Sequence, residues 1–535
     1  MPKKHLYTVL VVALALNALS CTAVTSLFPT KTPIPPTATP TPTATPTPTP
    51  SPTEEPYVPT FVSTRCPFDV PTGATVECGF VDVPETRSGD PTGMVRLPVA
   101  VYKSTSDSPA PDPVIYLQGG PGSGSLEWSA GWYYDFVKPV LETRDFIFFD
   151  QRGTGFSEPN LDCWEVKLRA LQDLQAGVPD EVDVDRYLDA LITCRNRLRL
   201  SDVNLAAYTS TDSAADVNDI ATALGYGQQP DGLHPVNLYG ISYGTRLAQA
   251  VMRDHPQIVR SVVLDSVVPI DVSVYTELSA SAMLQVLFDG CAADPACNAA
   301  YPDLGTVFYD LVEQLDAEPV QVAMNEPSTS QTITVTVNGA RLMNAALWAL
   351  RSPYMVRQMP QAIYEARDGN YTFLGYGLGF QQGVYDYMSL GMMISVNCHD
   401  HAFASTPEAL DGLIAEYRLH EALGDTSITG EEIVSFCDKW GAAPFDPRDG
   451  EPLVSSIPTL ILAGEYDSTT PPLFGKRVHE TLIDSAYFVF PGEGHAPSAG
   501  EDCALGIALA FIADPALEPD AACIAEMGGP HFVVP

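Results

Sequence analysis

The hydrophobic and polar positions along the chain predict a sheet of buried strands that alternate with helices. Continuous apolar runs, typical of strands covered on both faces by helices, occur at residues 113–117 and 146–150. Two earlier β-branched runs, at residues 79–83 and 95–102, suit a hairpin that enters the same sheet. We therefore expect an α/β fold with a mostly parallel central sheet flanked by helices.

Later apolar runs continue this pattern and divide the folded chain into parts. Four further strands are predicted, at residues 236–240, 261–269, 458–464 and 486–490. A long stretch between the second and third of these has helical, irregular and cysteine-bearing character. We interpret it as a mainly helical lid, residues 271–444, inserted between the two parts of the core, residues 60–270 and 445–535.

The N-terminus has the layout of a secretory signal. Lys3 and Lys4 precede an apolar run that ends at Leu16, and Cys21 follows shortly after. Residues 18–21 resemble a bacterial lipobox, in which the cysteine is acylated; ordinary cleavage nearby is the alternative. Residues 22–59 are rich in alternating threonine and proline, which favours an extended tether over a packed core. We expect an exported bacterial protein, in the cell envelope or outside the cell, whose lipid anchor is its one link to the membrane.

The charge balance excludes some partners. The 535 residues include 66 acidic and 28 basic side chains, which give a formal net charge of −38. Such a chain repels nucleic-acid phosphates and anionic lipid surfaces. We therefore expect no nucleic-acid partner, and we expect a monomer.

The cysteine count fits an oxidising compartment. Of eleven cysteines, ten remain if Cys21 carries lipid, and an even number in an exported chain favours disulfides. Pairing of neighbours is the simplest hypothesis, although the sequence alone does not determine it: Cys66–Cys78, Cys163–Cys194, Cys291–Cys297, Cys398–Cys437 and Cys503–Cys523. The cluster at residues 398–401, Cys-His-Asp-His, is also a conceivable metal site, but one cysteine in a predicted disulfide and no second cluster argue against it. We expect no metal and no cofactor.

The segment Gly240-Ile241-Ser242-Tyr243-Gly244 matches G-x-S-x-G, the pattern of a nucleophilic serine on a tight turn. The motif alone is weak, because a glycine turn can produce it by chance. Its context strengthens it, since a predicted strand ends at Gly240 and a predicted helix follows. Ser242 is therefore our candidate nucleophile.

Two later residues complete a candidate catalytic triad. A serine hydroxyl needs a base, and His495 follows the last predicted strand in a glycine-rich loop. Asp467 follows the strand before it, where a carboxylate can orient the imidazole. Glu465 is a competing candidate two residues earlier. The alternative for His495 is an ordinary surface histidine.

Two backbone segments are candidates for an oxyanion hole. Tyr243 follows the nucleophile, and Gly119 and Gly120 follow the buried strand that ends at residue 117. Read without this context, the glycines are only a turn. The segment 150–157, "DQRGTGFS", closes another strand, and we expect it to support the nucleophile structurally rather than take part in catalysis.

Five ordered motifs, "QGGPG", "DQRGTGFS", "GISYG", "GEYDSTTPP" and "GEGHAP", resemble those of the prolyl aminopeptidase and tripeptidyl aminopeptidase family of α/β-hydrolases. The spaced cysteines are closest to the secreted bacterial tripeptidyl type, and the resemblance spans roughly residues 60–530, including the C-terminal portion of that family. It implies Ser242, Asp467 and His495 as the triad, a peptide substrate and no cofactor. Gln118 stands where many members have histidine, which leaves substrate preference open.

Three functions remain to be distinguished. The first is an exopeptidase that releases amino acids or tripeptides from peptide N-termini. Such an enzyme needs a carboxylate for the substrate amine, and Asp400 is our candidate, with a solvated surface acid as the alternative. The second is a carboxylic-ester hydrolase with the same triad. The third is a non-catalytic surface protein that binds peptides.

Overall fold

The computed structural model describes most of the chain beyond the tether. The described residues are 57–87, 93–177, 180–229, 231–272, 278–400 and 430–535. The predicted signal segment, Cys21, all but the last residues of the tether, and His401 lie outside the described residues. Val58–Pro535 form one compact unit. None of the helices in the described ranges combines the length and the apolar character that crossing a bilayer requires.

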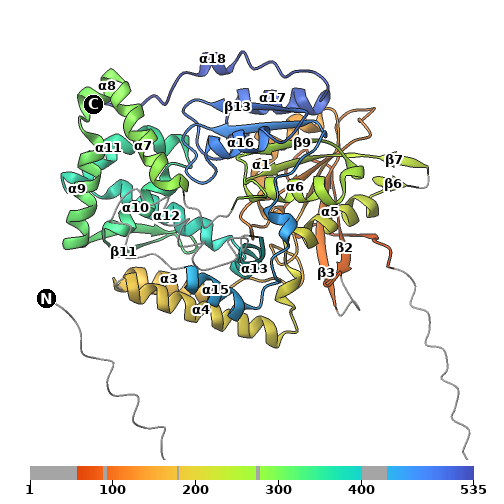
Figure 1. Ribbon diagram of the computed structural model, residues 1–535, viewed down its shortest axis with the longest axis horizontal. Coiled ribbons are helices and arrows are strands. Elements are labelled where there is room, and N and C mark those ends of the chain that lie inside the picture. Colours follow the sequence, from red (N-terminus) through yellow and green to blue (C-terminus); the bar gives the residue numbers. More distant parts are fainter. Residues whose placement is uncertain (1–56, 88–92, 178–179, 230, 273–277, 401–429) are drawn as a thin grey trace, which may run out of the picture. The chain divides into compact units, whose positions relative to one another are not determined.

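A nine-stranded sheet forms the centre of this unit (Figure 1). The strand order is β1-β2-β3-β5-β4-β8-β9-β12-β13. Strands β1, β2, β3 and β5 pair antiparallel, and all pairs from β5 to β13 are parallel. This confirms the expected mostly parallel sheet with its entering hairpin; β1 was not predicted. The bounds are β1 (Phe61–Thr64), β2 (Val76–Pro84), β3 (Met94–Tyr102), β4 (Val114–Leu117), β5 (Phe146–Phe149), β8 (Val236–Ile241), β9 (Val259–Asp265), β12 (Thr459–Gly464) and β13 (Ser485–Phe490).

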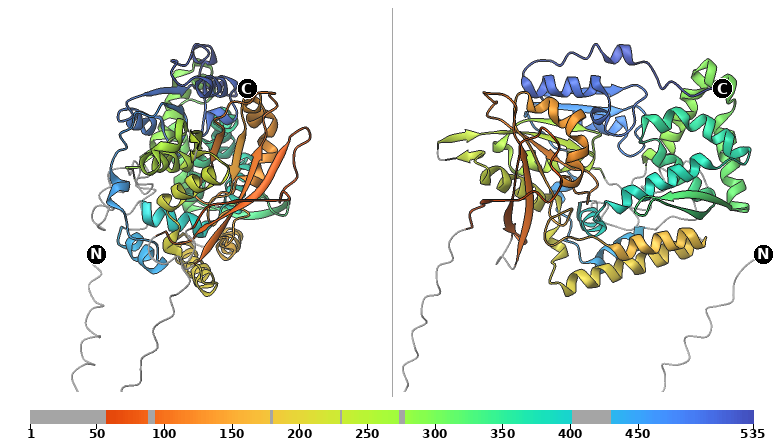
Figure 2. Two further views of the ribbon diagram at one scale, coloured as in Figure 1. Left: turned by 90° about the vertical axis from the view of Figure 1, so that its right-hand side faces the viewer. Right: turned by 180° about the vertical axis from the view of Figure 1, so that it is seen from behind.

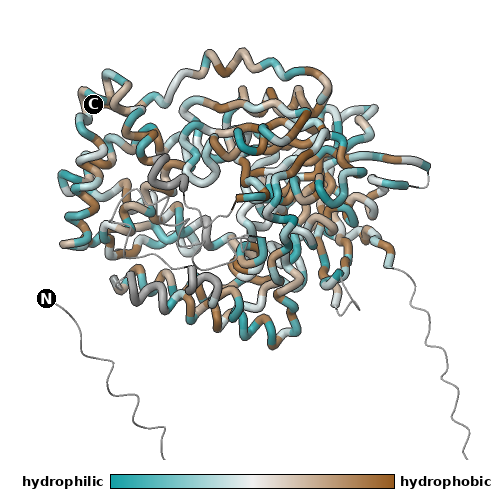
Figure 3. Tube along the Cα trace, viewed as in Figure 1, coloured by the Kyte–Doolittle hydropathy of each residue, from teal (hydrophilic) through white to brown (hydrophobic). Residues whose placement is uncertain are grey.

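Both faces of the sheet are buried, because side chains alternate along each strand and helices cover either side. Ile115 and Leu117 of β4 pack into one core, and Val114 and Tyr116 pack into the other. Figure 3 shows hydrophobic positions, drawn in brown, along the trace in this part of the molecule. On the first face lie α5 (Ser210–Ala223), α6 (Tyr243–Asp254) and α16 (Pro472–His479); on the second lie α1 (Leu126–Trp132), η1 (Tyr133–Val137), α2 (Lys138–Leu141) and α17 (Asp502–Ala513).

A third core belongs to the segment between β9 and β12. It is mainly helical, as expected, and packs around Phe308, Leu315 and Met343, which are almost fully buried. The hairpin β10–β11 was missed, although β10 alternates buried and exposed positions as strands do. The elements are α7 (Leu278–Ala293), α8 (Pro295–Ala300), α9 (Leu304–Ala317), β10 (Val320–Glu326), β11 (Gln331–Val337), α10 (Gly339–Ala349), α11 (Pro353–Arg367) and α12 (Thr372–Asp386).

Four further helices join this segment to the sheet domain. Helices α3 (Trp164–Ala176) and α4 (Asp180–Leu200) pair with each other, and α3 also contacts β11. Helices α13 (Leu390–Asp400) and α15 (Gly430–Trp440) contact each other and α4 (Figure 2). Short elements complete the fold: η2 (Leu205–Ala207), β6 (Gly227–Gln229), β7 (Gly232–His234), η3 (Pro256–Ile258), η5 (Pro447–Gly450), η6 (Pro497–Ala499) and α18 (Ile524–Met527).

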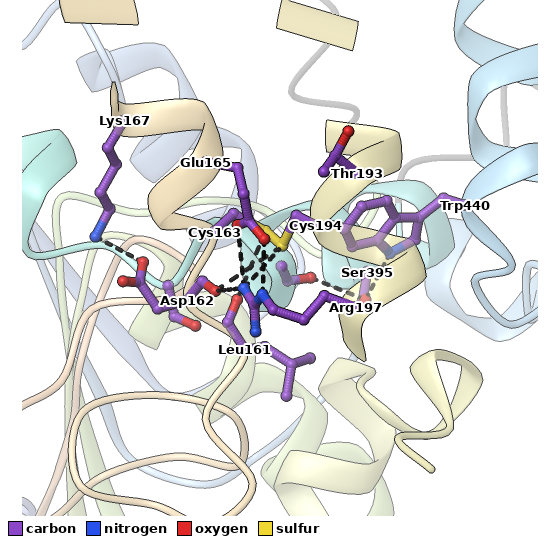
Figure 4. Close-up of a disulfide and its surroundings, with 12 residues drawn as sticks. Leu161, Asp162, Cys163, Glu165, Lys167, Thr193, Cys194, Arg197, Ser395 and Trp440 are labelled. Carbon is purple, nitrogen blue, oxygen red and sulfur yellow. Dashed lines mark hydrogen bonds and ion pairs between the residues drawn. A yellow bond between two sulfur atoms is a disulfide. The ribbon is translucent and has the colours of Figure 1, made fainter. Parts of the chain in front are cut away.

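Five disulfides join cysteines that are near neighbours in sequence. They are Cys66–Cys78, Cys163–Cys194, Cys291–Cys297, Cys398–Cys437 and Cys503–Cys523, the same pairs that neighbour pairing gives. Cys163–Cys194 ties the start of α3 to α4, beside the ion pair of Arg197 with Glu165 (Figure 4). Crosslinks of this kind each stabilise a folded chain by about 2–4 kcal/mol.

Candidate active site

Ser242 sits on a strained turn between β8 and α6. Its backbone has φ 59° and ψ −127°, a conformation that side chains rarely adopt. The flanking positions require glycine because the backbone approaches closely there. A Cβ atom on Gly240 would lie 2.5 Å from the carbonyl oxygen of Gly244, and a Cβ atom on Gly244 would lie 1.9 Å from the carbonyl oxygen of Leu117. The turn therefore has the geometry of a nucleophile elbow.

His495 and Asp467 are brought together from the loops that follow β13 and β12. The His495 Nδ1 atom lies 2.8 Å from Oδ2 of Asp467. Asp467 also accepts hydrogen bonds from the backbone N–H groups of Thr469 and Thr470, each at 2.9 Å, and from the Thr470 hydroxyl at 2.6 Å. The carboxylate is thereby fixed against the imidazole. Thr470 was not singled out from the sequence.

The two partners have opposed protonation preferences. Burial raises the pKa of Asp467, but the charge and hydrogen bond of His495 and the hydrogen bonds of Thr470 outweigh it and hold that pKa at about 2. Burial lowers the pKa of His495 below its usual 6.5 and outweighs the opposing effect of Asp467, while nearby Arg351 lowers it further. A neutral imidazole beside a carboxylate is the arrangement that a general base requires.

Glu465, the competing candidate, has a different role. Its Oε2 atom accepts a hydrogen bond from the backbone N–H of Gly492 at 2.8 Å. This contact stabilises the loop that leads to His495, but Glu465 is not the carboxylate bonded to the ring. The geometry thus favours Asp467 as the orienting residue.

The end of β9 tethers both the serine turn and the histidine loop. The Ser242 N–H donates to the carbonyl of Asp265 at 3.0 Å, and the Ala496 N–H donates to the hydroxyl of Ser266 at 2.7 Å. Ser242 and His495 therefore lie at the same carboxyl edge of the sheet. Within the described residues the Ser242 hydroxyl forms no hydrogen bond to the ring; such contacts commonly tighten only when substrate binds.

The glycine loop after β4 lies directly against the nucleophile. A Cβ on Gly119 would lie 2.9 Å from the Ser242 Cβ and 3.5 Å from its Oγ. The Gln118 carbonyl accepts a hydrogen bond from the Gln151 side chain at 2.8 Å, which holds the loop in place. Gly119 therefore lies against the nucleophile, and Tyr243 follows it directly in the chain.

The segment "DQRGTGFS" supports this loop from below. Asp150 is fully buried and accepts hydrogen bonds from the backbone N–H groups of Ser125, Leu126 and Phe156 at 2.6, 3.0 and 2.8 Å. A Cβ on Gly155 would lie 2.2 Å from the Asp150 carboxylate, so only glycine fits there. These contacts fix the start of α1 and agree with a structural role.

The structure corrects the role of Asp400. Its side chain is fully buried, with 0% exposure, and contacts Arg246 Nε at 3.3 Å, His399 Nδ1 at 2.7 Å and the hydroxyl of Ser210. A carboxylate with these internal partners neither faces a substrate amine nor is a solvated surface acid. Arg246 could not be predicted as its partner from local patterns, because it lies 154 positions away.

His399, Asp400 and Asp449 form a buried group whose ligand atoms lie within 4.8 Å of one another, close enough to hold a metal ion. Asp400 is already paired with Arg246, and Asp449 with Arg253. Burial lowers the pKa of His399, but Asp400 and Asp449 outweigh it and raise that pKa above 6.5, which favours the cation. This charge balance fits an internal ion-pair network better than a metal centre.

Comparisons with known proteins identify the fold family of the chain. A model of the alpha/beta hydrolase fold matches residues 112–501. Serine protease Hip1 of Mycobacterium tuberculosis is 24% identical over 449 residues, 80% of this chain and 82% of that protein. Tripeptidyl aminopeptidase of Streptomyces lividans is 30% identical over 203 residues, 36% of this chain and 35% of that protein. An esterase structure from Exiguobacterium antarcticum aligns with a TM-score of 0.33 and 14% identity, covering 79% of this chain and 96% of that one.

Proposed function

Because the chain belongs to the alpha/beta hydrolase fold family, we propose that it is a serine peptidase that releases amino acids or short peptides, such as tripeptides, from peptide N-termini. The observation that carries the proposal is the Asp467–His495 pair, held at the same sheet edge as the strained Ser242. The names of two relatives, a serine protease and a tripeptidyl aminopeptidase, favour a peptide substrate.

The proposed reaction proceeds through an acyl-enzyme. His495 accepts the Ser242 proton while the hydroxyl oxygen attacks the scissile carbonyl carbon. The backbone N–H of Tyr243 and that of Gly119 or Gly120 stabilise the oxyanion. His495 then donates its proton to the leaving amine as the C–N bond breaks. Water, deprotonated by His495, hydrolyses the acyl-enzyme and restores the serine.

The test compares matched peptides with free and with acetylated N-termini. An aminopeptidase cleaves the free-amine peptide and loses this activity when the amine is blocked, and Ser242→Ala abolishes cleavage. Equal cleavage of both peptides would identify an enzyme of another specificity. Turnover of p-nitrophenyl esters alone would identify an ester hydrolase. No reaction with any of these substrates would favour a non-catalytic binding protein.

We also propose that the protein is exported and anchored through a lipid on Cys21. The disulfides support an oxidising compartment, since such crosslinks are rare in the cytosol. Metabolic labelling with a fatty acid should mark the wild-type protein and not Cys21→Ala. Release of the variant from the membrane fraction would support the anchor, whereas unchanged labelling would contradict it.

A further inference from the structure

The two sides of the proposed oxyanion hole come from segments far apart in sequence, and one helix contacts both. Gly119 and Gly120 belong to the loop after β4, and Tyr243 begins α6. An oxyanion hole stabilises the transition state only if its donors are held at a fixed separation. Helix α13 is placed to supply this constraint.

Ser389, the residue before α13, is bonded to the glycine loop and to the segment 150–157 beside it. The Ser389 N–H donates to the Gly122 carbonyl at 2.8 Å, and the Ser389 hydroxyl donates to the Gly153 carbonyl at 2.6 Å. The approach is close, since a Cβ on Gly122 would lie 2.6 Å from the Ser389 carbonyl oxygen. Ser389 is only 4% exposed, so these hydrogen bonds do not compete with water.

The C-terminal end of α13 is bonded to the first turn of α6. Arg246 donates from Nη2 to the Asp400 carbonyl at 2.8 Å and pairs with its carboxylate at 3.3 Å from Nε. The same carboxylate accepts a hydrogen bond from the Ser210 hydroxyl. The Ser210 hydroxyl oxygen also lies 2.8 Å from the hydroxyl oxygen of Tyr243. Tyr243 and Arg246 are three positions apart and lie on one face of α6. All four side chains are buried.

Helix α13 is itself held in position by other elements. The Trp440 indole N–H donates to the Ser395 hydroxyl at 2.9 Å, and both side chains are fully buried (Figure 4). The disulfide Cys398–Cys437 joins the same two helices, α13 and α15. The helix can therefore act as a rigid connection between the glycine loop and α6.

We propose that Asp400, itself held by Arg246, is a positioning residue for the oxyanion hole, acting through Ser210 on Tyr243. This inference rests on the proposed function, because it assigns a role within the same acyl-transfer site. From the sequence, Asp400 was expected to bind the substrate amine; the proposal instead gives Asp400 a role in positioning the oxyanion hole. The effect is expected on the transition state, so kcat falls while KM stays constant.

Tyr243→Phe tests the proposal most cleanly, because it removes the hydroxyl but keeps the ring and the backbone N–H. We expect kcat to fall about tenfold. This is smaller than the ~10²–10³-fold loss of kcat that follows complete removal of an oxyanion donor, because the N–H is displaced and not removed. The rate of labelling by a fluorophosphonate should fall by the same factor. Tyr102→Phe is the matched control: its hydroxyl also bonds a buried serine, Ser129, at 2.8 Å, away from the site. It should lower Tm similarly without changing kcat.

A double-mutant cycle links the effect to Asp400. Asp400→Asn should lower kcat in the wild-type background and much less in the Tyr243→Phe background, because the second change acts through a bond already lost. If the kcat of Tyr243→Phe is within twofold of that of the wild type, the inference is overturned. If Ser242→Ala is inactive in the same assay, the proposed function still stands. Retained activity in Ser242→Ala would overturn both.

Discussion

The imidazole Nδ1 of His495 lies 2.8 Å from a carboxylate oxygen of Asp467, a residue with no exposed surface. The contact fixes the tautomer of the ring, so that the other nitrogen, Nε2, is left to accept a proton. Two threonine N–H groups and one hydroxyl hold the carboxylate in this orientation. The predicted chemistry depends on this pair.

Replacing Asp467 should abolish most activity without unfolding the protein. Asp467→Asn keeps the size of the side chain but allows the wrong imidazole tautomer, so we expect kcat to fall by a factor on the order of 10³–10⁴. Steady-state kinetics on a free-amine peptide measures the change. Glu465→Gln is the matched control and should retain activity within a few-fold, since Glu465 bonds Gly492 instead of the ring. The reverse order of effects would reassign the triad carboxylate.

The acid limb of the activity profile should lie below pH 6.5. His495 must be neutral to accept the serine proton, and burial, reinforced by Arg351, lowers the pKa of the ring in spite of Asp467. Activity is therefore retained as the pH falls to 6.5 and is lost only when the ring protonates at lower pH. The dependence of kcat/KM on pH measures this. In Arg351→Gln, the limb should move to higher pH; an unchanged limb would show that Arg351 does not influence the base.

Gly119 should tolerate no side chain. A methyl group there would lie 2.9 Å from both the Ser242 Cβ and the Ile241 carbonyl oxygen, so Gly119→Ala must displace either the loop or the nucleophile. A displacement of about 1 Å can cost ~10² in rate, and we expect a loss of at least that order. Gly131→Ala is the control, because a Cβ at this position in α1 meets nothing within 4 Å. Full activity in Gly119→Ala would exclude the loop from the oxyanion hole.

Much of this site could be predicted from sequence because its determinants are local. The serine turn, the histidine loop and Asp467 each follow a continuous apolar strand, and parallel strands bring their carboxyl ends to one edge. Asp400 could not be interpreted in this way. Its partners Arg246 and Ser210 lie 154 and 190 positions away, and nothing in the local pattern distinguishes a buried acid from an exposed one.

The hairpin β10–β11 and the role of Thr470 were missed for different reasons. The hairpin β10–β11 carries an alternating pattern that local reading could have detected, with Val322, Met324 and Glu326 buried and the residues between them exposed. Thr470 follows Asp467 by three positions, but its role appears only once the turn folds and its hydroxyl reaches the carboxylate. Turn geometry of this kind has no distinct sequence signal.

Stability should fall as the pH rises from about 4 to 7, in part because of Asp265. Burial raises the pKa of this carboxyl to about 7, so the folded protein holds a proton that the unfolded chain, with a pKa of 3.8, releases. The folded state binds more protons across this window and is progressively disfavoured as they are lost. Asp265→Asn should flatten the dependence of Tm on pH between 4 and 7. Glu493, whose pKa burial also raises to about 7, would account for a remaining slope.

An unchanged slope in Asp265→Asn would contradict this assignment. The variant also serves as a check on the site, because the Asp265 backbone carbonyl, which receives the Ser242 N–H, is retained. Its activity near pH 5, where the wild-type carboxyl is protonated and neutral like an amide, should therefore stay close to that of the wild type.

The most direct test of the central claim is the site of covalent labelling by a fluorophosphonate, read by mass spectrometry of the digested protein. We predict one adduct, on the Ser242 hydroxyl, formed at a rate that requires Asp467 and absent from Ser242→Ala, which should also be inactive on peptides. An adduct on another serine, or peptide cleavage that persists in Ser242→Ala, would contradict the assignment of Ser242 as the nucleophile.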